Sequence, residues 1–160
     1  MADAIDLRIL GRLQKDCSQS LELLSDNVGL SPTSCYRRIK RLEDNGVIRA
    51  RVAVLDDKKL GLQVTAMFMI KLDKDTADID RRMQQILASR PEVQECYLIT
   101  GEFDFVMVAK LRDATEYTDY IYNFLETYKD IPIRTYSSTL VIRTVKKSFE
   151  IPLNGLDQGA

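Results

Sequence analysis

Residues 29–48 read GLSPTSCYRRIKRLEDNGVI, and this stretch decides the first half of the fold. Ser31 can cap a helix, Pro32 suits its first turn, and Gly46 accepts the left-handed conformation that follows a helix C-terminus. A turn of two residues separates this helix from an earlier amphipathic segment that begins at Ser20. Two helices joined by so tight a turn predict a helix-turn-helix.

Cations gather on the second of these helices. Six Lys or Arg lie in residues 31–51 against two acids, although the whole chain of 160 residues has a formal net charge of -1. At 100° per residue, Cys35, Ile39 and Leu42 form a buried stripe, and most cations lie on the other side. Cations neutralise phosphates, and Arg, Ser, Thr and Tyr can contact base edges. The residues expected to bind double-stranded DNA are Ser31, Thr33, Ser34, Tyr36, Arg37, Arg38, Lys40, Arg41, Arg49 and Arg51.

The N-terminal part of a recognition helix is the part that reaches the bases. The expected base readers are therefore Thr33, Ser34 and Arg37. The expected phosphate anchors are Arg38, Lys40 and Arg41. The alternative is a solvated helix face whose cations pair with Glu43 and Asp44 and bind no nucleic acid.

The hydrophobic period changes after Gly46. The segment VIRARVAVLD alternates and predicts a short strand, and DDKKLGL is a polar connection. From Val64 the pattern predicts β-α-β-β-α-β, with a last strand over residues 133–145, an antiparallel sheet and both helices on one face. The fold class is thus α+β: an N-terminal helix-turn-helix domain followed by a ferredoxin-like βαββαβ sandwich domain. The expected divisions are 1–52 for DNA binding, 53–62 for a hinge strand and linker, and 63–160 for ligand binding and oligomerisation.

The strand that starts at Val64 is apolar on both sides, since Met67 and Met69 alternate with the residues that face the helices. A sheet covered by helices on one face only should alternate more cleanly. We therefore expect a second chain to cover this face, giving a homodimer at least. The alternative is that a loop or the tail IPLNGLDQGA covers it.

Several function classes lose support from composition. The chain has no histidine, and its three cysteines (Cys17, Cys35 and Cys96) lie too far apart for a zinc spacing or a disulfide framework. We expect no metal, no cofactor and no enzymatic activity. No apolar run is long enough to span a membrane, and acids stand where a signal peptide has cations, so a cytoplasmic protein is expected.

Four segments carry a family resemblance: IDLRILGRLQKD, VGLSPTSCYRRIKRLEDNGVI, ARVAVLDDKKLGL and GEFDF. In this order they resemble the leucine-responsive regulatory protein and asparagine regulator (Lrp/AsnC) family of prokaryotic transcription factors, from about Ile5 to Ser148. The resemblance implies an N-terminal helix-turn-helix, a hinge strand and a C-terminal α/β domain. It also implies dimers that assemble to octamers, and a small effector, usually an amino acid.

The loop TGEFDF interrupts two apolar strands. One interpretation is a simple turn in which Gly101 supplies a positive φ and Asp104 satisfies local amides. The resemblance implies instead that the loop forms part of an effector pocket, with an opposite wall from the last strand. An acid could accept the ammonium of an amino acid, and amides near Gly101 its carboxylate. The candidate effector residues are Thr100, Gly101, Glu102, Asp104, Thr135, Tyr136, Ser137 and Ser138.

Two other functions remain open at the level of sequence. In the first, the chain is an architectural DNA-organising protein that responds to no effector. In the second, paired sheets enclose a reactive cavity in which Glu102, Asp104 and Tyr136 do acid–base work. The lack of histidine, metal spacing and phosphate loop disfavours the enzyme.

Overall fold

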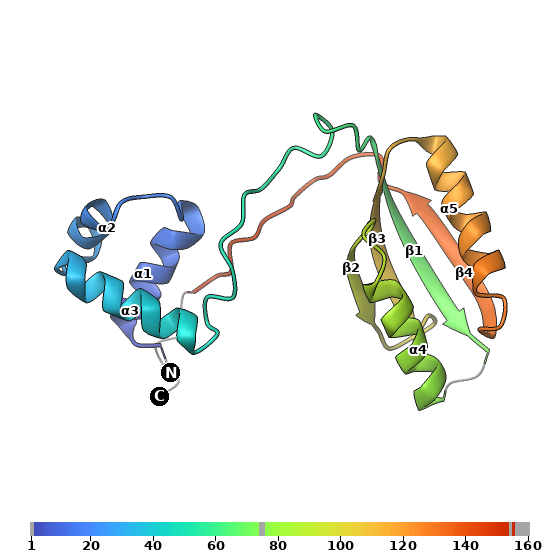
Figure 1. The fold of residues 1–160 in the computed structure, drawn as a ribbon, viewed down its shortest axis with the longest axis horizontal. Coiled ribbons are helices and arrows are strands. Elements are labelled where there is room, and N and C mark those ends of the chain that lie inside the picture. Colours follow the sequence, from blue (N-terminus) through green and yellow to red (C-terminus); the bar gives the residue numbers. More distant parts are fainter. Residues whose placement is uncertain (1, 74–75, 154, 156–160) are drawn as a thin grey trace. The chain divides into compact units, whose positions relative to one another are not determined.

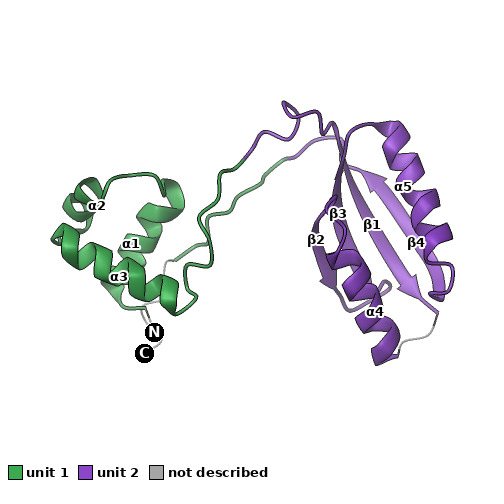
Figure 2. Cartoon of the chain, in the orientation of Figure 1, with its two compact units in different colours: residues 1–54, 145–160 green, residues 55–144 purple. Residues whose placement is uncertain are grey.

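The computed structural model describes residues 2–73, 76–153 and 155 (Figure 1). These residues form two compact units, shown in different colours in Figure 2. The first unit holds the chain up to Val54 together with the C-terminal segment from Val145, and the second holds residues 55–144. No helix in the described part of the chain is long and apolar enough to cross a membrane.

The first unit contains three helices: α1 (Ala4–Lys15), α2 (Leu21–Val28) and α3 (Pro32–Asp44). Each begins after a residue whose side chain accepts a backbone N–H of the first turn, namely Asp3, Ser20 and Ser31. Gly29 ends α2 at φ 69°, a left-handed conformation that glycine adopts without strain. The predicted helix-turn-helix is therefore confirmed, with α2 and α3 as its two helices.

Apolar residues from all three helices make the core of the first unit: Ile9, Leu24, Val28, Cys35 and Ile39. The C-terminal segment adds to this unit by packing on α1. Its Leu153 Cδ1 lies 3.8 Å from the point where a Cβ on Gly11 would stand, so a small residue in α1 leaves room for the segment.

The segment after α3 differs from the prediction. The sequence predicted a strand over residues 47–56, but the segment forms none. The side chains of Val52 and Val54 are 72% and 70% exposed. A strand needs a second backbone with which to exchange hydrogen bonds, and none of the described residues provides one. Although its residues alternate, this segment therefore has no neighbouring strand among the described residues.

The second unit follows the predicted βαββαβ order: β1 (Val64–Leu72), α4 (Ala77–Ala88), β2 (Val93–Leu98), β3 (Phe105–Leu111), α5 (Ala114–Thr127) and β4 (Ile133–Leu140). The strands form one antiparallel sheet in the order β2-β3-β1-β4. The ferredoxin-like fold is confirmed. The last strand is shorter than predicted, because its pairing with β1 ends at Leu140 opposite Ala66.

One face of the sheet is covered by both helices. The buried residues of this core include Phe68, Met107, Met83, Leu87, Tyr120 and Phe124, from β1, β3, α4 and α5. On the opposite face Met67 is 39% exposed and Met69 is half-buried, and the described residues of this unit leave that face open. The second apolar face predicted for β1 is therefore present.

Candidate nucleic-acid interface and effector loop

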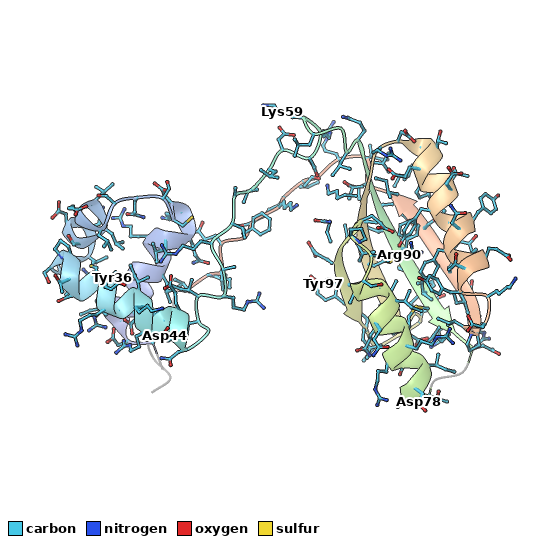
Figure 3. All side chains as sticks on the ribbon, in the orientation of Figure 1. Tyr36, Asp44, Lys59, Asp78, Arg90 and Tyr97 are labelled. Atoms are coloured by element: carbon cyan, nitrogen blue, oxygen red, sulfur yellow. The ribbon has the colours of Figure 1, made fainter. Side chains whose placement is uncertain are left out.

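The core fixes which side of α3 faces outward. Cys35, Ile39 and Leu42 are buried, as the helical spacing predicted. The candidate DNA contacts on α3 that are exposed are Thr33, Tyr36, Arg37, Lys40 and Arg41, and those that are half-buried are Ser34 and Arg38. Tyr36, labelled on α3 in Figure 3, is 56% exposed. Hydroxyls, a phenol and cations therefore share the outward side of one helix.

The N-terminus of α3 carries two neighbouring hydroxyls. Ser31 Oγ accepts the backbone N–H of Ser34 at 3.2 Å and donates to Ser34 Oγ at 3.0 Å. These bonds satisfy one of the free N–H groups of the first turn. Ser31 is thus the cap of the helix, and Ser34 holds its hydroxyl at the same end.

The candidate cations differ in what surrounds them. Arg37 has no hydrogen bond or ion pair within the described ranges. Lys40 lies 3.2 Å from Asp44 one turn later, and both side chains are more than half exposed. This hydrogen bond and charge raise the pKa of Lys40. Arg49 is exposed, and Arg51 pairs with Glu43 at 2.7 Å. Pairs so exposed are weak and can exchange partners.

Arg38 and Arg41 have a different environment, because both reach back to Asp6 of α1. Arg38 Nη1 lies 2.8 Å from Asp6 Oδ1, and Arg41 Nη2 lies 2.5 Å from Asp6 Oδ2. The Asp6 side chain is fully buried. Arg38 also donates to Asp3 Oδ2 at 2.6 Å, which lowers the pKa of Asp3. These two candidate phosphate anchors are therefore held by acids of the same unit.

The second candidate site surrounds the loop between β2 and β3. Gly101 has φ 119°, which few other residues adopt, and Thr100 and Glu102 are exposed beside it. The Asp104 side chain is 15% exposed and accepts from Lys71 Nζ at 2.6 Å and from the Leu72 N–H at 2.7 Å. Burial raises the pKa of this carboxyl, but the bonds from Lys71 and Leu72 outweigh it and bring the pKa below its ordinary value.

The hydroxyls of β4 divide between the two faces of the sheet. Tyr136 and Ser138 lie on the helix side, where Ser138 bonds to the Tyr117 hydroxyl at 2.7 Å. Thr135 and Ser137 lie on the open side. Of the four candidates on β4, only these two share the open face with the loop.

Pairing in the sheet brings the loop and β4 to the same end. Thr135 is the register partner of Lys71, whose ammonium group binds Asp104. Lys71 thus links two candidate regions that lie more than thirty residues apart. Sequence reasoning did not select Lys71 or Asp6. The available signal for Lys71 was that it is the single charge of an otherwise apolar strand. For Asp6 it was an acid next to Ile5 in the first turn of α1.

Two families match consecutive parts of the chain. The family described as Lrp/AsnC ligand binding domain matches residues 65–151, and the family described as winged helix-turn-helix DNA-binding matches residues 3–49. An uncharacterised HTH-type transcriptional regulator of Sinorhizobium fredii, y4tD, is 35% identical over 94% of this chain and 88% of its own length.

Solved structures agree with these matches. An AsnC family transcriptional regulator from Agrobacterium tumefaciens has a TM-score of 0.87 at 33% identity, covering 94% of this chain and 97% of that one. A transcriptional regulator from Neisseria meningitidis, solved as its L-Met complex, has a TM-score of 0.90 at 29% identity, covering 98% of this chain and 99% of that one. Both similarities extend over the two units.

Proposed function

Because the chain belongs to the Lrp/AsnC family of helix-turn-helix transcriptional regulators, we propose that it binds specific double-stranded DNA sites under the control of a small effector. Residues 1–52 would bind DNA, 53–62 would act as a hinge, and 63–160 would bind the effector and hold the oligomer together, with the segment from Val145 packing back on the helical unit. The site of action would be the cytoplasm.

The DNA proposal rests on the cations on the outward side of α3. There Arg37 has no internal partner among the described residues, and Lys40 has only an exposed one that phosphate can replace. Thr33, Ser34 and Arg37, near the N-terminus of α3, would read base edges in the major groove. The residues that would add hydrogen bonds or positive potential around them are Ser31, Tyr36, Arg38, Lys40, Arg41, Arg49 and Arg51.

The test is fluorescence anisotropy on a duplex selected from a random-sequence pool by the purified protein. We expect Arg37→Ala to lower affinity for the selected duplex more than for an unrelated duplex, because a base contact discriminates by about 1–3 kcal/mol. Arg81→Ala is the matched control, since it removes an exposed cation from α4 in the other unit. Equal loss on both duplexes would make Arg37 a phosphate anchor.

We propose an amino acid as the effector, bound at the loop of residues 100–104. The L-Met complex of the related Neisseria meningitidis regulator supports this class of ligand. Glu102 is exposed and would accept the ammonium group, while Asp104 is already bonded to Lys71. The amides around Gly101 would hold the carboxylate. Thr135 and Ser137 would line the site from β4, with Tyr136 and Ser138 behind them on the helix side.

A thermal-shift screen against the twenty amino acids tests this proposal. A ligand at 100 times its dissociation constant should stabilise the folded chain by about 2.7 kcal/mol. Glu102→Gln should abolish the stabilisation by the amino acid that gives it in the wild type. If none of the twenty raises the melting temperature, the chain is instead an effector-independent DNA-organising protein.

We propose that the open face of the sheet forms a homodimer and that dimers assemble further, to octamers. Met67, Met69, Val106 and Val108 lie on this face as an apolar patch. An effector bound between dimers would change which assembly is favoured, and the assembly sets the spacing of the α3 helices. Effector and DNA would then be linked reciprocally, and a pseudo-palindromic DNA site is expected.

Light scattering tests the assembly. The wild type should have at least twice the mass of the chain. Met67→Lys should reduce that mass, because a buried unpaired charge disfavours the interface. Gln84→Lys on the exposed side of α4 is the control, because it adds the same charge away from the open face of the sheet. A wild type that stays monomeric at micromolar concentration would refute the dimer.

A further inference from the structure

The carboxylate of Asp6, in the first turn of α1, is buried. Its two oxygens accept three hydrogen bonds: from the Asp3 N–H at 3.1 Å, from Arg38 Nη1 at 2.8 Å and from Arg41 Nη2 at 2.5 Å. The capping box with Asp3 accounts for only the first of these bonds. Two guanidinium groups from another helix exceed what a helix cap needs.

The two arginines stand one turn apart on α3. At 100° per residue, positions three apart lie on the same side of a helix about 5 Å along its axis. Arg38 and Arg41 therefore hold α3 at two points on a single carboxylate that cannot move away, since it is enclosed. Two points resist both rotation of α3 about its axis and sliding along α1.

We infer that Asp6 is a positioning residue that divides the cations of α3 into two classes, an inference that rests on the proposed DNA binding. Arg38 and Arg41 orient the helix through their bonds to Asp6. Arg37 and Lys40, on the outward side, contact phosphates and bases. The positive charge of YRRIKR thus serves two separate tasks.

The acidic partners of these side chains support this division more than their exposure does, because the Arg41 side chain is itself 51% exposed. Arg38 has a side chain only 25% exposed and has two acidic partners, Asp3 and Asp6, whose hydrogen bonds raise its pKa. Lys40 has a side chain 56% exposed, and its single acidic partner is itself 62% exposed. A phosphate can replace an exposed partner without leaving a buried charge alone. The buried carboxylate of Asp6, in contrast, would lose one of its two guanidinium partners if Arg38 turned to DNA, and both if Arg41 turned as well.

The experiment measures how DNA affinity depends on salt. Each phosphate contact contributes about 0.9 to the slope of log affinity against log salt concentration, between roughly 50 and 200 mM KCl. The probes are a duplex selected from a random pool and an unrelated duplex of the same length. The variants are Arg37→Gln, Lys40→Gln, Arg38→Gln and Asp6→Asn.

Three expected outcomes separate the two classes of cation. Arg37→Gln and Lys40→Gln should each lower the slope by about 1 on the selected duplex. Arg38→Gln should leave the slope on the unrelated duplex unchanged and lower the ratio of selected to unrelated affinity, roughly tenfold. Asp6→Asn removes a negative charge and releases two cations, so it should raise the slope and strengthen binding to unrelated DNA while lowering that ratio. If Asp6 only stabilised the fold, Asp6→Asn would instead weaken binding to both duplexes.

Folding is checked separately by circular dichroism. If Asp6→Asn does not fold, Arg38→Gln and Arg38→Lys still decide, because a lysine keeps one bond to Asp6 and should restore part of the ratio. A loss of slope in Arg38→Gln equal to that in Arg37→Gln would overturn the inference and make Arg38 a phosphate anchor. A wild type that binds neither duplex at low salt would instead refute the proposed function.

Discussion

The side-chain amide of Gln14 exchanges two hydrogen bonds with the backbone of Ile151, which lies 137 positions further along the chain. Gln14 Nε2 donates to the Ile151 carbonyl at 3.1 Å, and the Ile151 N–H donates to Gln14 Oε1 at 2.6 Å. Because both the N–H and the carbonyl of Ile151 are bonded to one side chain, the segment is held in one register. The C-terminal segment is therefore part of the helical unit, although it follows the sheet in sequence.

We expect Gln14→Ala to destabilise the first unit. The substitution removes two hydrogen bonds, each of which contributes about 0.5–1.5 kcal/mol to the free energy of unfolding. Because both bonds are exposed to solvent, we expect a loss near the lower end of this range. Differential scanning calorimetry should show a fall of a few degrees in the melting temperature. Gln84→Ala on the exposed side of α4 is the control and should leave it unchanged; equal shifts would mean that the segment does not stabilise α1.

A neighbouring pair of leucines tests the core of the same unit. Leu24 is 1% exposed and Leu23 is 54% exposed on the same helix. Leu24→Ala should lower the free energy of unfolding by about 2–5 kcal/mol, because it removes buried methyl groups and leaves a cavity. Leu23→Ala should change it by about 0.5 kcal/mol or less. Urea titration followed by circular dichroism measures both, and similar losses would contradict the packing of α2.

Stability should depend on pH through Asp104. The folded state lowers the pKa of this carboxyl below 3.8, so the unfolded state binds more protons at low pH. The stabilisation is therefore fully present above about pH 3.8 and is lost as the pH falls through the folded-state pKa. Asp104→Asn should lower the melting temperature at neutral pH, and the difference from wild type should shrink in acid.

The matched control for this pH series is Glu102→Gln in the same loop. Its side chain has no hydrogen bond or ion pair with the other described residues, so the substitution should leave the pH profile of the melting temperature as it is in the wild type. A difference between Asp104→Asn and wild type that is constant at every pH would mean that the Lys71 pair contributes nothing to stability.

The three thiols should react at different rates. Cys17 is exposed, Cys35 is buried and Cys96 is half-buried. Burial raises the pKa of both Cys35 and Cys96, which lowers the fraction of reactive thiolate. An aromatic disulfide reagent at mildly alkaline pH should therefore modify one thiol quickly and the others slowly. Cys17→Ser should remove the fast phase, and a fast phase that persists would show that another thiol is accessible.

Local pattern was enough to predict much of the fold and which side of α3 is exposed. Ser31, Pro32 and Gly46 bounded α3 correctly, and the spacing of Cys35 and Ile39 identified its buried side. The alternation after Val64 predicted the order of strands and helices. These features depend on neighbours within one or two turns, where the chain itself fixes the geometry. The strand expected over residues 47–56 is not formed. An alternating pattern favours an extended backbone, but a strand also needs a neighbouring backbone to pair with, and the described residues offer none.

The sequence by itself thus determined the helices, the strands, their order and the cationic side of α3. Only the tertiary structure decided that Arg38 and Arg41 meet Asp6, that Lys71 holds Asp104, and that Ile151 returns to α1. The physical reason is range: periodicity states on which side of its own element a residue lies, whereas the identity of the opposing group depends on how elements pack. That packing separates the cations of α3 into those that bond to Asp6 and those that do not.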